Sequence, residues 1–256
     1  IEGSARLRGR ELLTARDEEL REVRGAQIAM IFQDPMTALN PVHRVGDQIV
    51  EQIRAHDEGI SKGAAMDRTV DLLEQVGIPR IRRDAYPHEL SGGQKQRVMI
   101  AMALACDPEL LIADEPTTAL DVMVQAQVLQ LLAELQRDRG LAMIFITHDL
   151  SVLSTVADRL AVMYAGRLVE TGPAKEMLRG AKHPYTKALA AAFPTIGDAA
   201  SRLAPSGLAG DPPDPAAVPR GCPFHPRCPM AIDECAAVDV ELREIVPGWE
   251  VACIRV

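Results

Sequence analysis

The chain has 256 residues, 47% of them hydrophobic, and a formal net charge of −8. That length allows one domain, or one domain with an appendage, to bury an apolar core. The negative charge and the 3% aromatic content argue against a nucleic-acid groove, nothing at the N-terminus resembles a signal peptide, and no apolar run approaches the ~18 residues that span a bilayer.

The first third of the chain predicts one strand followed by helices. A short helix over 17–24 ends at a glycine, and the apolar run 28–32 predicts a strand. A loop with two prolines follows over 34–41. Residues 45–77 have helical periodicity, with Ser61 as a candidate N-cap and Gly-Ile-Pro as the stop.

Residues 90–121, LSGGQKQRVMIAMALACDPELLIADEPTTALD, combine a glycine turn, a helix and a strand. The two glycines after Ser91 have no side chains, so backbone N–H groups can approach a ligand closely. The helix that follows directs the positive end of its dipole at this turn, which favours phosphate. Pro108 ends the helix, and 110–113 predicts a short, fully buried strand.

Two adjacent acids, Asp114 and Glu115, follow that strand. The carboxyl ends of parallel strands open onto ligand crevices. One carboxylate can hold Mg²⁺ and the other can orient or deprotonate an attacking water, which suits phosphoryl transfer. A glycine turn or an acidic pair alone is a weak signal, but their conjunction at this spacing is specific.

The next elements alternate helix and strand. An amphipathic helix begins after Asp121 and ends at Gly140, and residues 141–146 predict a strand buried on both faces. His148 follows that strand, so a right-handed crossover would place it beside the acids.

The last third of the chain predicts a ribbon, two helices and a linker. Residues 158–171 predict a two-stranded ribbon that turns at 165–167, and helices follow from Pro173 and from His183. Six prolines and three glycines from Pro194 to Arg220 predict a linker or a meandering cover.

This arrangement resembles the ATP-binding-cassette (ABC) ATPases. Residues 90–94 match the signature sequence of that family, 110–115 match its Walker B strand and 119–121 match its D-loop. Gln33, after the strand 28–32, matches the Q-loop, and His148 matches the switch histidine. The five motifs occur in the order that the family requires.

The resemblance implies an α/β fold: a P-loop NTPase-type ABC ATPase lobe with a mostly parallel sheet, a helical subdomain and a cysteine-rich C-terminal extension. The ATPase core would comprise 1–33 and 91–180, the helical subdomain with the signature 34–90, and the extension 181–256. The family's phosphate loop needs Gly-Lys-Ser/Thr, which none of the five lysines provides. This Walker A element is therefore expected before Ile1, and the chain alone is expected not to hydrolyse ATP.

The same resemblance implies a role for each motif residue. Glu115 would activate the attacking water, and Gln33 and His148 would sense the γ-phosphate as further catalytic residues. Asp114 would position Mg²⁺. The signature would hold the ATP of a partner subunit, and the D-loop aspartate would couple the two sites. The residues implied in nucleotide binding are Ser91, Gly92, Gly93, Gln94 and Asp121.

Four of the five cysteines lie near the C-terminus, at Cys222, Cys228, Cys235 and Cys253. Four thiols in 32 residues, in a chain without a signal peptide, favour metal over disulfides. The separations of five, six and seventeen residues are not zinc-finger pairs, and two Cys-Pro dipeptides are compatible with an iron–sulfur loop. Spacing alone leaves a cluster, zinc and free thiols open, with His225 as a candidate substitute ligand.

A second resemblance concerns this tail. HPYTKAL at 183–189 together with GCPFHPRCP at 221–229 is similar to the C-terminal extension of oligopeptide and dipeptide importer ATPases. Some members of that family hold a [4Fe–4S] cluster through four such cysteines. The resemblance therefore implies a [4Fe–4S] cluster at the four tail cysteines, with zinc as the second choice.

Both resemblances imply the ATP-hydrolysing subunit of a bacterial ABC importer for di- or oligopeptides, peripheral on the cytoplasmic face of the inner membrane. ATP and Mg²⁺ would be its cofactors. Its partners would be a homologous ATPase subunit in a heterodimer, transmembrane permease subunits and, indirectly, a substrate-binding protein, with no nucleic acid. Two alternatives stay open: a soluble ABC ATPase acting on nucleic acid or ribosomes, and a metal- or redox-sensing module on a degenerate ATPase lobe.

Overall fold

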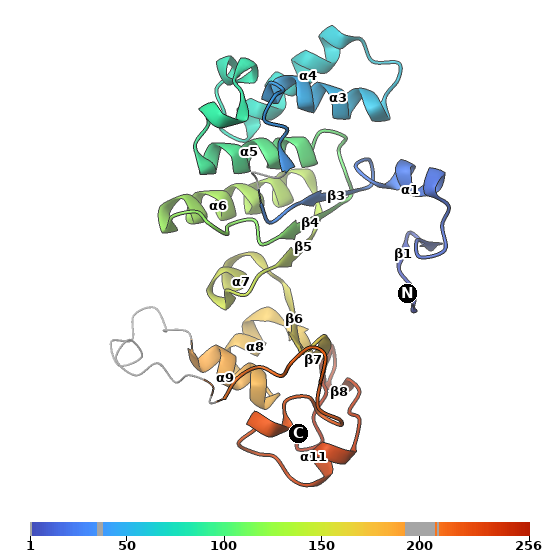
Figure 1. The fold of residues 1–256 in the computed structure, drawn as a ribbon, viewed down its shortest axis with the longest axis vertical. Coiled ribbons are helices and arrows are strands. Elements are labelled where there is room, and N and C mark those ends of the chain that lie inside the picture. Colours follow the sequence, from blue (N-terminus) through green and yellow to red (C-terminus); the bar gives the residue numbers. More distant parts are fainter. Residues whose placement is uncertain (1, 35–37, 193–207, 209) are drawn as a thin grey trace. The chain divides into compact units, whose positions relative to one another are not determined.

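The computed structural model describes residues 2–34, 38–192, 208 and 210–256 (Figure 1). The chain divides into two compact units, Ile1–His148 and Asp149–Val256. Each unit has its own sheet and its own cluster of buried apolar side chains. Most of the predicted linker from Pro194 to Arg220 lies outside the described residues. None of the helices in the described ranges combines the length and apolarity needed to span a bilayer.

The first unit is built on a parallel three-stranded sheet in the order β3-β4-β5. Its strands are β3 (Ile28–Ile31), β4 (Leu110–Asp114) and β5 (Ala142–Ile146). Met30, Ile112 and Ile144 are register partners across the three strands. The parallel sheet that the sequence predicted is therefore confirmed.

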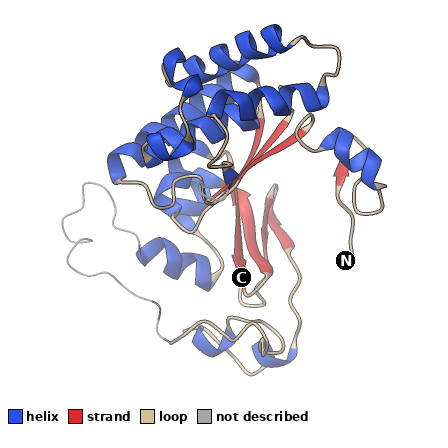
Figure 2. Cartoon of the chain, turned by 45° about the horizontal axis from the view of Figure 1, so that its top comes forward, coloured by secondary structure: helices blue, strands red, loops and turns tan. Residues whose placement is uncertain are grey.

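Helices cover one face of this sheet (Figure 2). They are α5 (Gly92–Ala103) and α6 (Val122–Arg139), and the strand residues packed in the same cluster include Ile31 and Leu111. Successive strand residues point to opposite faces, so Ile144 and Ile146 are 49% and 47% exposed. The prediction that both strands are buried on both faces is wrong, because the unit's helices cover only one face of the sheet.

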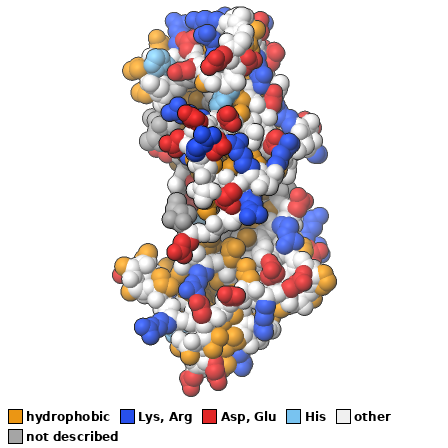
Figure 3. Space-filling model, turned by 90° about the vertical axis from the view of Figure 1, so that its right-hand side faces the viewer, with side chains coloured by type: hydrophobic (Ala, Val, Ile, Leu, Met, Phe, Trp, Pro, Cys, Tyr) orange, Lys and Arg blue, Asp and Glu red, His pale blue; other side chains and the backbone are white. Residues whose placement is uncertain are grey.

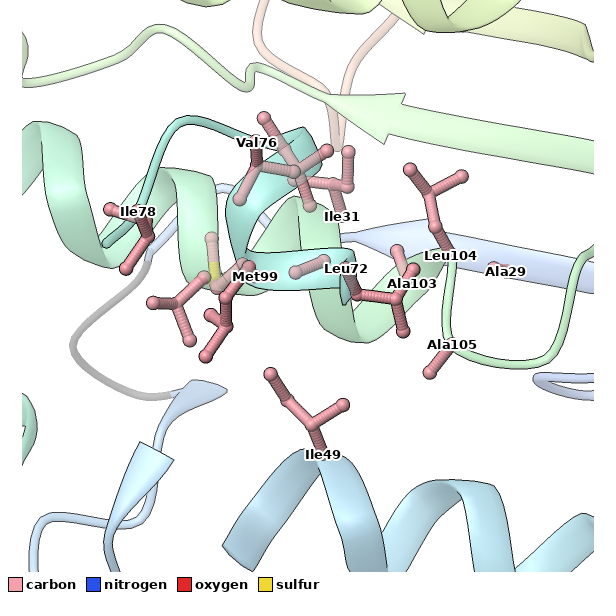
Figure 4. Packing of buried hydrophobic residues seen from close by; sticks show 14 of the residues in the cluster. Ala29, Ile31, Ile49, Leu72, Val76, Ile78, Met99, Ala103, Leu104 and Ala105 are labelled. Carbon is pink, nitrogen blue, oxygen red and sulfur yellow. The ribbon is translucent and has the colours of Figure 1, made fainter. Parts of the chain in front are cut away.

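The helical pattern over 45–77 is confirmed as two helices, α3 (Val45–His56) and α4 (Lys62–Gln75). The hydroxyl of Ser61 accepts a hydrogen bond from the N–H of Ala64, so the predicted N-cap is confirmed. Ile49, Leu72 and Met99 bring α3, α4 and α5 into one core (Figure 4). Two 3-10 helices, η1 (Arg80–Asp84) and η2 (Pro87–Glu89), lead into α5.

The N-terminal segment adds a small hairpin that the sequence did not predict. It consists of β1 (Arg6–Leu7) and β2 (Arg10–Glu11). The predicted short helix follows as α1 (Asp17–Val23), and its last residue, Val23, is buried.

The second unit contains an antiparallel sheet in the order β6-β7-β9-β8. The predicted ribbon is β6 (Arg159–Tyr164) and β7 (Arg167–Pro173). It turns at Ala165 and Gly166 with φ of 47° and 79°, the positive values that a type I′ hairpin turn requires. β7 also pairs with β9 (Trp249–Val251), which pairs with β8 (Arg243–Val246). The predicted boundary between core and extension at residue 180 stays a prediction, although this pairing crosses it.

Short helices complete the second unit. They are α7 (Leu150–Val156), α8 (Ala174–Gly180), α9 (Pro184–Ala192), η3 (His225–Arg227) and α11 (Glu234–Ala237). The predicted helices from Pro173 and from His183 are thus present as α8 and α9. Phe224 is fully buried at the centre of this unit's apolar cluster.

Candidate functional site

The carboxyl ends of the three parallel strands carry the predicted catalytic residues. Gln33 lies two residues beyond β3, Glu115 follows β4 directly, and His148 lies two residues beyond β5. Because the strands are neighbours and run in the same direction, their ends meet at one edge of the sheet. The structure therefore brings together three residues that are far apart in the sequence.

The carboxylate of Glu115 is the centre of this group. Its Oε2 accepts hydrogen bonds from Nε2 of Gln33 at 2.7 Å and from Oγ1 of Thr118 at 2.8 Å. Its Oε1 lies 2.9 Å from Nδ1 of His148. Hydrogen bonds, from His148 first and Thr118 next, hold the pKa of Glu115 below its usual range. At neutral pH the carboxylate is therefore ionised and able to accept a proton.

The sequence analysis did not single out Thr118. It is the third residue after Glu115, and Pro116 between them is a turn former. The N–H of Thr118 donates to the carbonyl oxygen of Glu115 at 3.1 Å, which closes the turn. The sequence signal for Thr118 is its position three residues after Glu115. In a turn of this length, its hydroxyl comes back to the Glu115 side chain.

The signature residues form the first turn of α5. Oγ of Ser91 accepts from the N–H of Gln94, and Oε1 of Gln94 accepts from the N–H of Ser91, which is a capping box. Gly92 and Gly93 are helical. A Cβ on Gly93 would lie 2.6 Å from Cγ1 of Val124, so this glycine is required by the close approach of α5 and α6.

The signature and the Glu115 group do not meet within the described residues. The polar side chains of the signature bond to each other, whereas the described partners of Glu115 are Gln33, Thr118 and His148. The carboxylate of Asp121 caps α6 by accepting from the N–H groups of Met123 and Val124, at 3.1 and 3.0 Å. Its predicted coupling of two sites stays a prediction.

Comparison with known proteins identifies the family. The families described as ABC transporter and as oligopeptide/dipeptide transporter, C-terminal region, match residues 1–118 and 169–235. The chain is 48% identical over 265 residues to a putative peptide import ATP-binding protein of Brucella ovis, covering 99% of this chain and 78% of the relative. The chain belongs to the ABC transporter ATP-binding proteins of the oligopeptide/dipeptide family.

Two further relatives support this assignment. The dipeptide transport ATP-binding protein DppD of Escherichia coli K12 is 49% identical over 247 residues, which are 96% of this chain and 75% of DppD. Among solved structures, the dimeric ATP-binding cassette MJ0796 bound to ADP and phosphate has a TM-score of 0.61 and 28% identity, over 68% of this chain and 74% of that chain. The predicted ABC ATPase fold and ATPase class are therefore confirmed.

ATP and Mg²⁺ are the ligands that an ABC ATPase is expected to bind. Mg²⁺ usually keeps several waters and takes one or two carboxylates together with substrate phosphates. Asp114, half-buried at the last position of β4 and next to Glu115, offers such a carboxylate. The site residues of this ABC protein therefore fit a Mg²⁺ that is held in part by the nucleotide.

The surroundings of the four tail cysteines contradict the prediction of a [4Fe–4S] cluster. All four line one cavity of about 10 Å³, together with His183 and Phe224 among others. That volume holds a single water at most. No group of three or more His, Cys, Asp or Glu side chains in the described part of the chain could hold a metal ion. The predicted [4Fe–4S] cluster is therefore wrong, and the second choice, zinc, has no site either.

The tail cysteines are buried or half-buried in the folded chain. Burial raises the pKa of Cys222 and of Cys228 above its usual value. All five cysteines of the chain are free. His225, the candidate substitute ligand, instead places its Nδ1 2.9 Å from the backbone oxygen of Cys222.

The first residues of HPYTKAL, His183-Pro184-Tyr185 (the HPY run), have a structural role that the sequence did not reveal. The carboxylate of Glu170 on β7, which is fully buried, accepts from the N–H groups of Lys182 and His183 at 2.8 and 3.0 Å, and from Nε1 of Trp249 at 2.8 Å. Nδ1 of His183 accepts from the N–H of Tyr185 at 3.1 Å. Glu170 thus fixes the start of α9 and β9 to the centre of the second unit.

We expect acid to destabilise the second unit through His183. Burial lowers the pKa of His183 to about 4, although the Glu170 carboxylate opposes this shift. In the unfolded chain the pKa is about 6.5, so between pH 6.5 and 4 the unfolded state binds a proton that the folded state does not. The free energy of unfolding should therefore fall as the pH falls through this window, by about 3 kcal/mol.

Denaturant unfolding at pH 7, 5 and 4, followed by the fluorescence of Trp249, measures this loss, since the chain has a single tryptophan and it lies in the second unit. His183→Gln is the matched variant that cannot titrate. The interpretation is contradicted when wild type and variant lose the same free energy between pH 7 and 4.

Proposed function

We propose that the protein is the ATP-hydrolysing subunit of a bacterial ABC importer for di- and oligopeptides. The observation that carries the proposal is the convergence of Gln33 and His148 on the carboxylate of Glu115. An ionised carboxylate at a strand end, beside a second acid, is the arrangement that general-base catalysis of phosphoryl transfer needs. The peptide cargo is inferred from the names of the two relatives, a peptide import protein and a dipeptide transport protein.

The residues of this edge have distinct roles in the proposal. Glu115 accepts the proton of the water that attacks the γ-phosphate, and Asp114 contributes to holding Mg²⁺. Gln33 and His148 lie in the loops that follow β3 and β5, and both side chains are exposed, that of His148 by 77%. Both are therefore placed to exchange their contact with Glu115 for the γ-phosphate when ATP binds.

The signature serves the second half of a shared site. Ser91, Gly92, Gly93 and Gln94 form the N-terminal turn of α5, where N–H groups and the helix dipole favour an anion. In the proposal this turn holds the ATP of a homologous partner subunit, in a heterodimer, and Asp121 couples the two sites. The solved relative MJ0796 is a dimer, which supports a dimeric ATPase.

The remaining partners follow from the importer assignment. Transmembrane permease subunits hold the protein at the cytoplasmic face of the inner membrane, and a substrate-binding protein delivers peptide to them. Closure of the ATPase dimer on ATP and its reopening after hydrolysis drive the permease between two states.

The nucleic-acid alternative is not favoured. The net charge of the chain is −8, and nucleic-acid binding requires a basic patch or stripe. On the face of the molecule in Figure 3, acidic and basic side chains are interspersed. The metal-sensing alternative depends on the tail cluster, for which the cysteines offer no metal site.

Peptide uptake by cells tests the cargo. Cells that lack the gene should lose uptake of a radiolabelled tripeptide and regain it with the full-length wild-type gene. Glu109→Gln, at the opposite end of the Walker B strand from Glu115, should restore uptake equally well, because Glu109 is exposed and pairs only with Arg8 across 2.7 Å in the described ion pairs. Unchanged peptide uptake, with loss of uptake of a metal ion or another small solute, would assign a different cargo.

A further inference from the structure

The three partners of the Glu115 carboxylate differ in how firmly they are held. Gln33 is exposed in the loop after β3, and the His148 side chain is 77% exposed after β5. Thr118 is half-buried, and its neighbour Thr117 is buried, with 7% exposure. Nε2 of Gln125 on α6 donates to the carbonyl oxygen of Thr117 at 3.1 Å. The turn that carries Thr118 is therefore anchored to a helix.

The backbone of Glu115 is held from both sides. Its N–H donates to the carbonyl oxygen of Ile146 on β5 at 2.9 Å, and its carbonyl oxygen accepts from the N–H of Thr118. Its φ of 45° lies in the left-handed region, which few residues other than glycine adopt. The strained conformation directs the side chain back over its own turn, where the Thr118 hydroxyl reaches Oε2 at 2.8 Å.

We propose that Thr118 is a positioning residue for the hydrolysis of ATP: its hydroxyl holds Oε2 of Glu115, so that Oε1 is the oxygen that accepts the proton from the attacking water. In this step the water proton passes to Oε1 and the water oxygen forms the bond to the γ-phosphorus. The bond from that phosphorus to the bridging oxygen breaks, and its electron pair leaves with ADP. His148, the described partner of Oε1, must move aside first.

A branched side chain suits this task. Threonine has few χ1 rotamers because two heavy atoms occupy its Cβ, so its hydroxyl is held in one direction at little entropic cost. The hydrogen bond from the Thr118 hydroxyl to Oε2 restricts the orientation of the Glu115 carboxylate. Gln33 and His148 can then move away while the carboxylate keeps this orientation.

The test uses the full-length protein in its assembled transporter and rests on the proposed function. Thr118→Val removes the hydroxyl and keeps the shape, whereas Thr118→Ser keeps the hydroxyl. We expect kcat for ATP to fall about 10-fold in Thr118→Val, the scale of one hydrogen bond to a charged group, with KM within about 2-fold. Thr118→Ser should stay within about 2-fold of wild type in both constants.

Two results would overturn the inference. One is a wild-type kcat in Thr118→Val, whether or not KM rises, and the other is an equal fall of kcat in Thr118→Val and Thr118→Ser. Where valine packs poorly in the half-buried turn, Thr118→Ala against Thr118→Ser asks the same question, because both lack the γ-methyl group and only serine has the hydroxyl.

A double variant separates this inference from the proposed function. If Thr118 acts through Glu115, Glu115→Gln combined with Thr118→Val should turn over no more slowly than Glu115→Gln alone. A further 10-fold fall (about 1.4 kcal/mol) would mean that Thr118 acts elsewhere. Full turnover in Glu115→Gln would instead overturn the assignment of the general base, whatever Thr118 contributes.

Discussion

Glu115→Gln in the full-length protein should lower ATP turnover by at least about 100-fold while ATP still binds. An amide has nearly the same shape as a carboxylate, so Gln33 and Thr118 keep an acceptor at this position. The amide cannot accept a proton at neutral pH, whereas the Glu115 carboxylate, whose pKa its hydrogen bonds lower, is ionised there and has a free lone pair. The variant therefore loses the chemical step and retains the bound substrate.

The measurement compares steady-state turnover with nucleotide binding in the same preparation. Glu109→Gln is the matched control, because it changes an acid of the same type at the other end of the same strand. Its turnover should equal that of the wild type. Near-normal turnover in Glu115→Gln, or a loss of ATP binding equal to the loss of turnover, would remove Glu115 from the role of general base.

The site could be predicted from the sequence because its residues occupy the ends of strands. Parallel strands with helical crossovers deliver their carboxyl ends to one edge, so His148 could be placed beside Glu115 without coordinates, whereas Gln33 was assigned to the site through its match to the Q-loop of the family. Their hydrogen bonds confirm this proximity. The rule places residues at the edge but does not orient them, and for this reason the turn that returns Thr118 to Glu115 was not predicted.

The cysteine tail was harder to read, since spacing along the chain reports only which residues are close. The four thiols do line one cavity, as their closeness in the sequence suggested. The volume of that cavity, and the burial that raises the pKa of Cys222 and Cys228, depend on the packing of the folded chain. The apolar cluster around Phe224 includes residues of α9 and of β9, which are far apart in the sequence. Likewise, one-sided burial of β5 could not be told from two-sided burial, because its run AMIFI is apolar throughout.

Glu170 gives the second large effect, this time on stability. Glu170→Ala should lower the free energy of unfolding of the second unit by about 3–5 kcal/mol. The substitution leaves the N–H groups of Lys182 and His183 and Nε1 of Trp249 without their acceptor, and it opens a cavity beside them. A buried donor that loses its acceptor still carries the full free-energy cost of having left water. This cost exceeds the net stabilisation that the hydrogen bond had provided.

Denaturant unfolding followed by Trp249 fluorescence measures the loss, and Glu241→Ala, an exposed acid in the same unit, is the control with an expected change within about 0.5 kcal/mol. Glu170→Gln should fall between the two, since its amide oxygen still accepts while its amide nitrogen faces other donors. A midpoint for Glu170→Ala equal to that of Glu241→Ala would mean that water replaces the carboxylate. In that case Glu170 would not be what joins the HPY run to β9, and the three N–H groups would be accessible to solvent in spite of their burial.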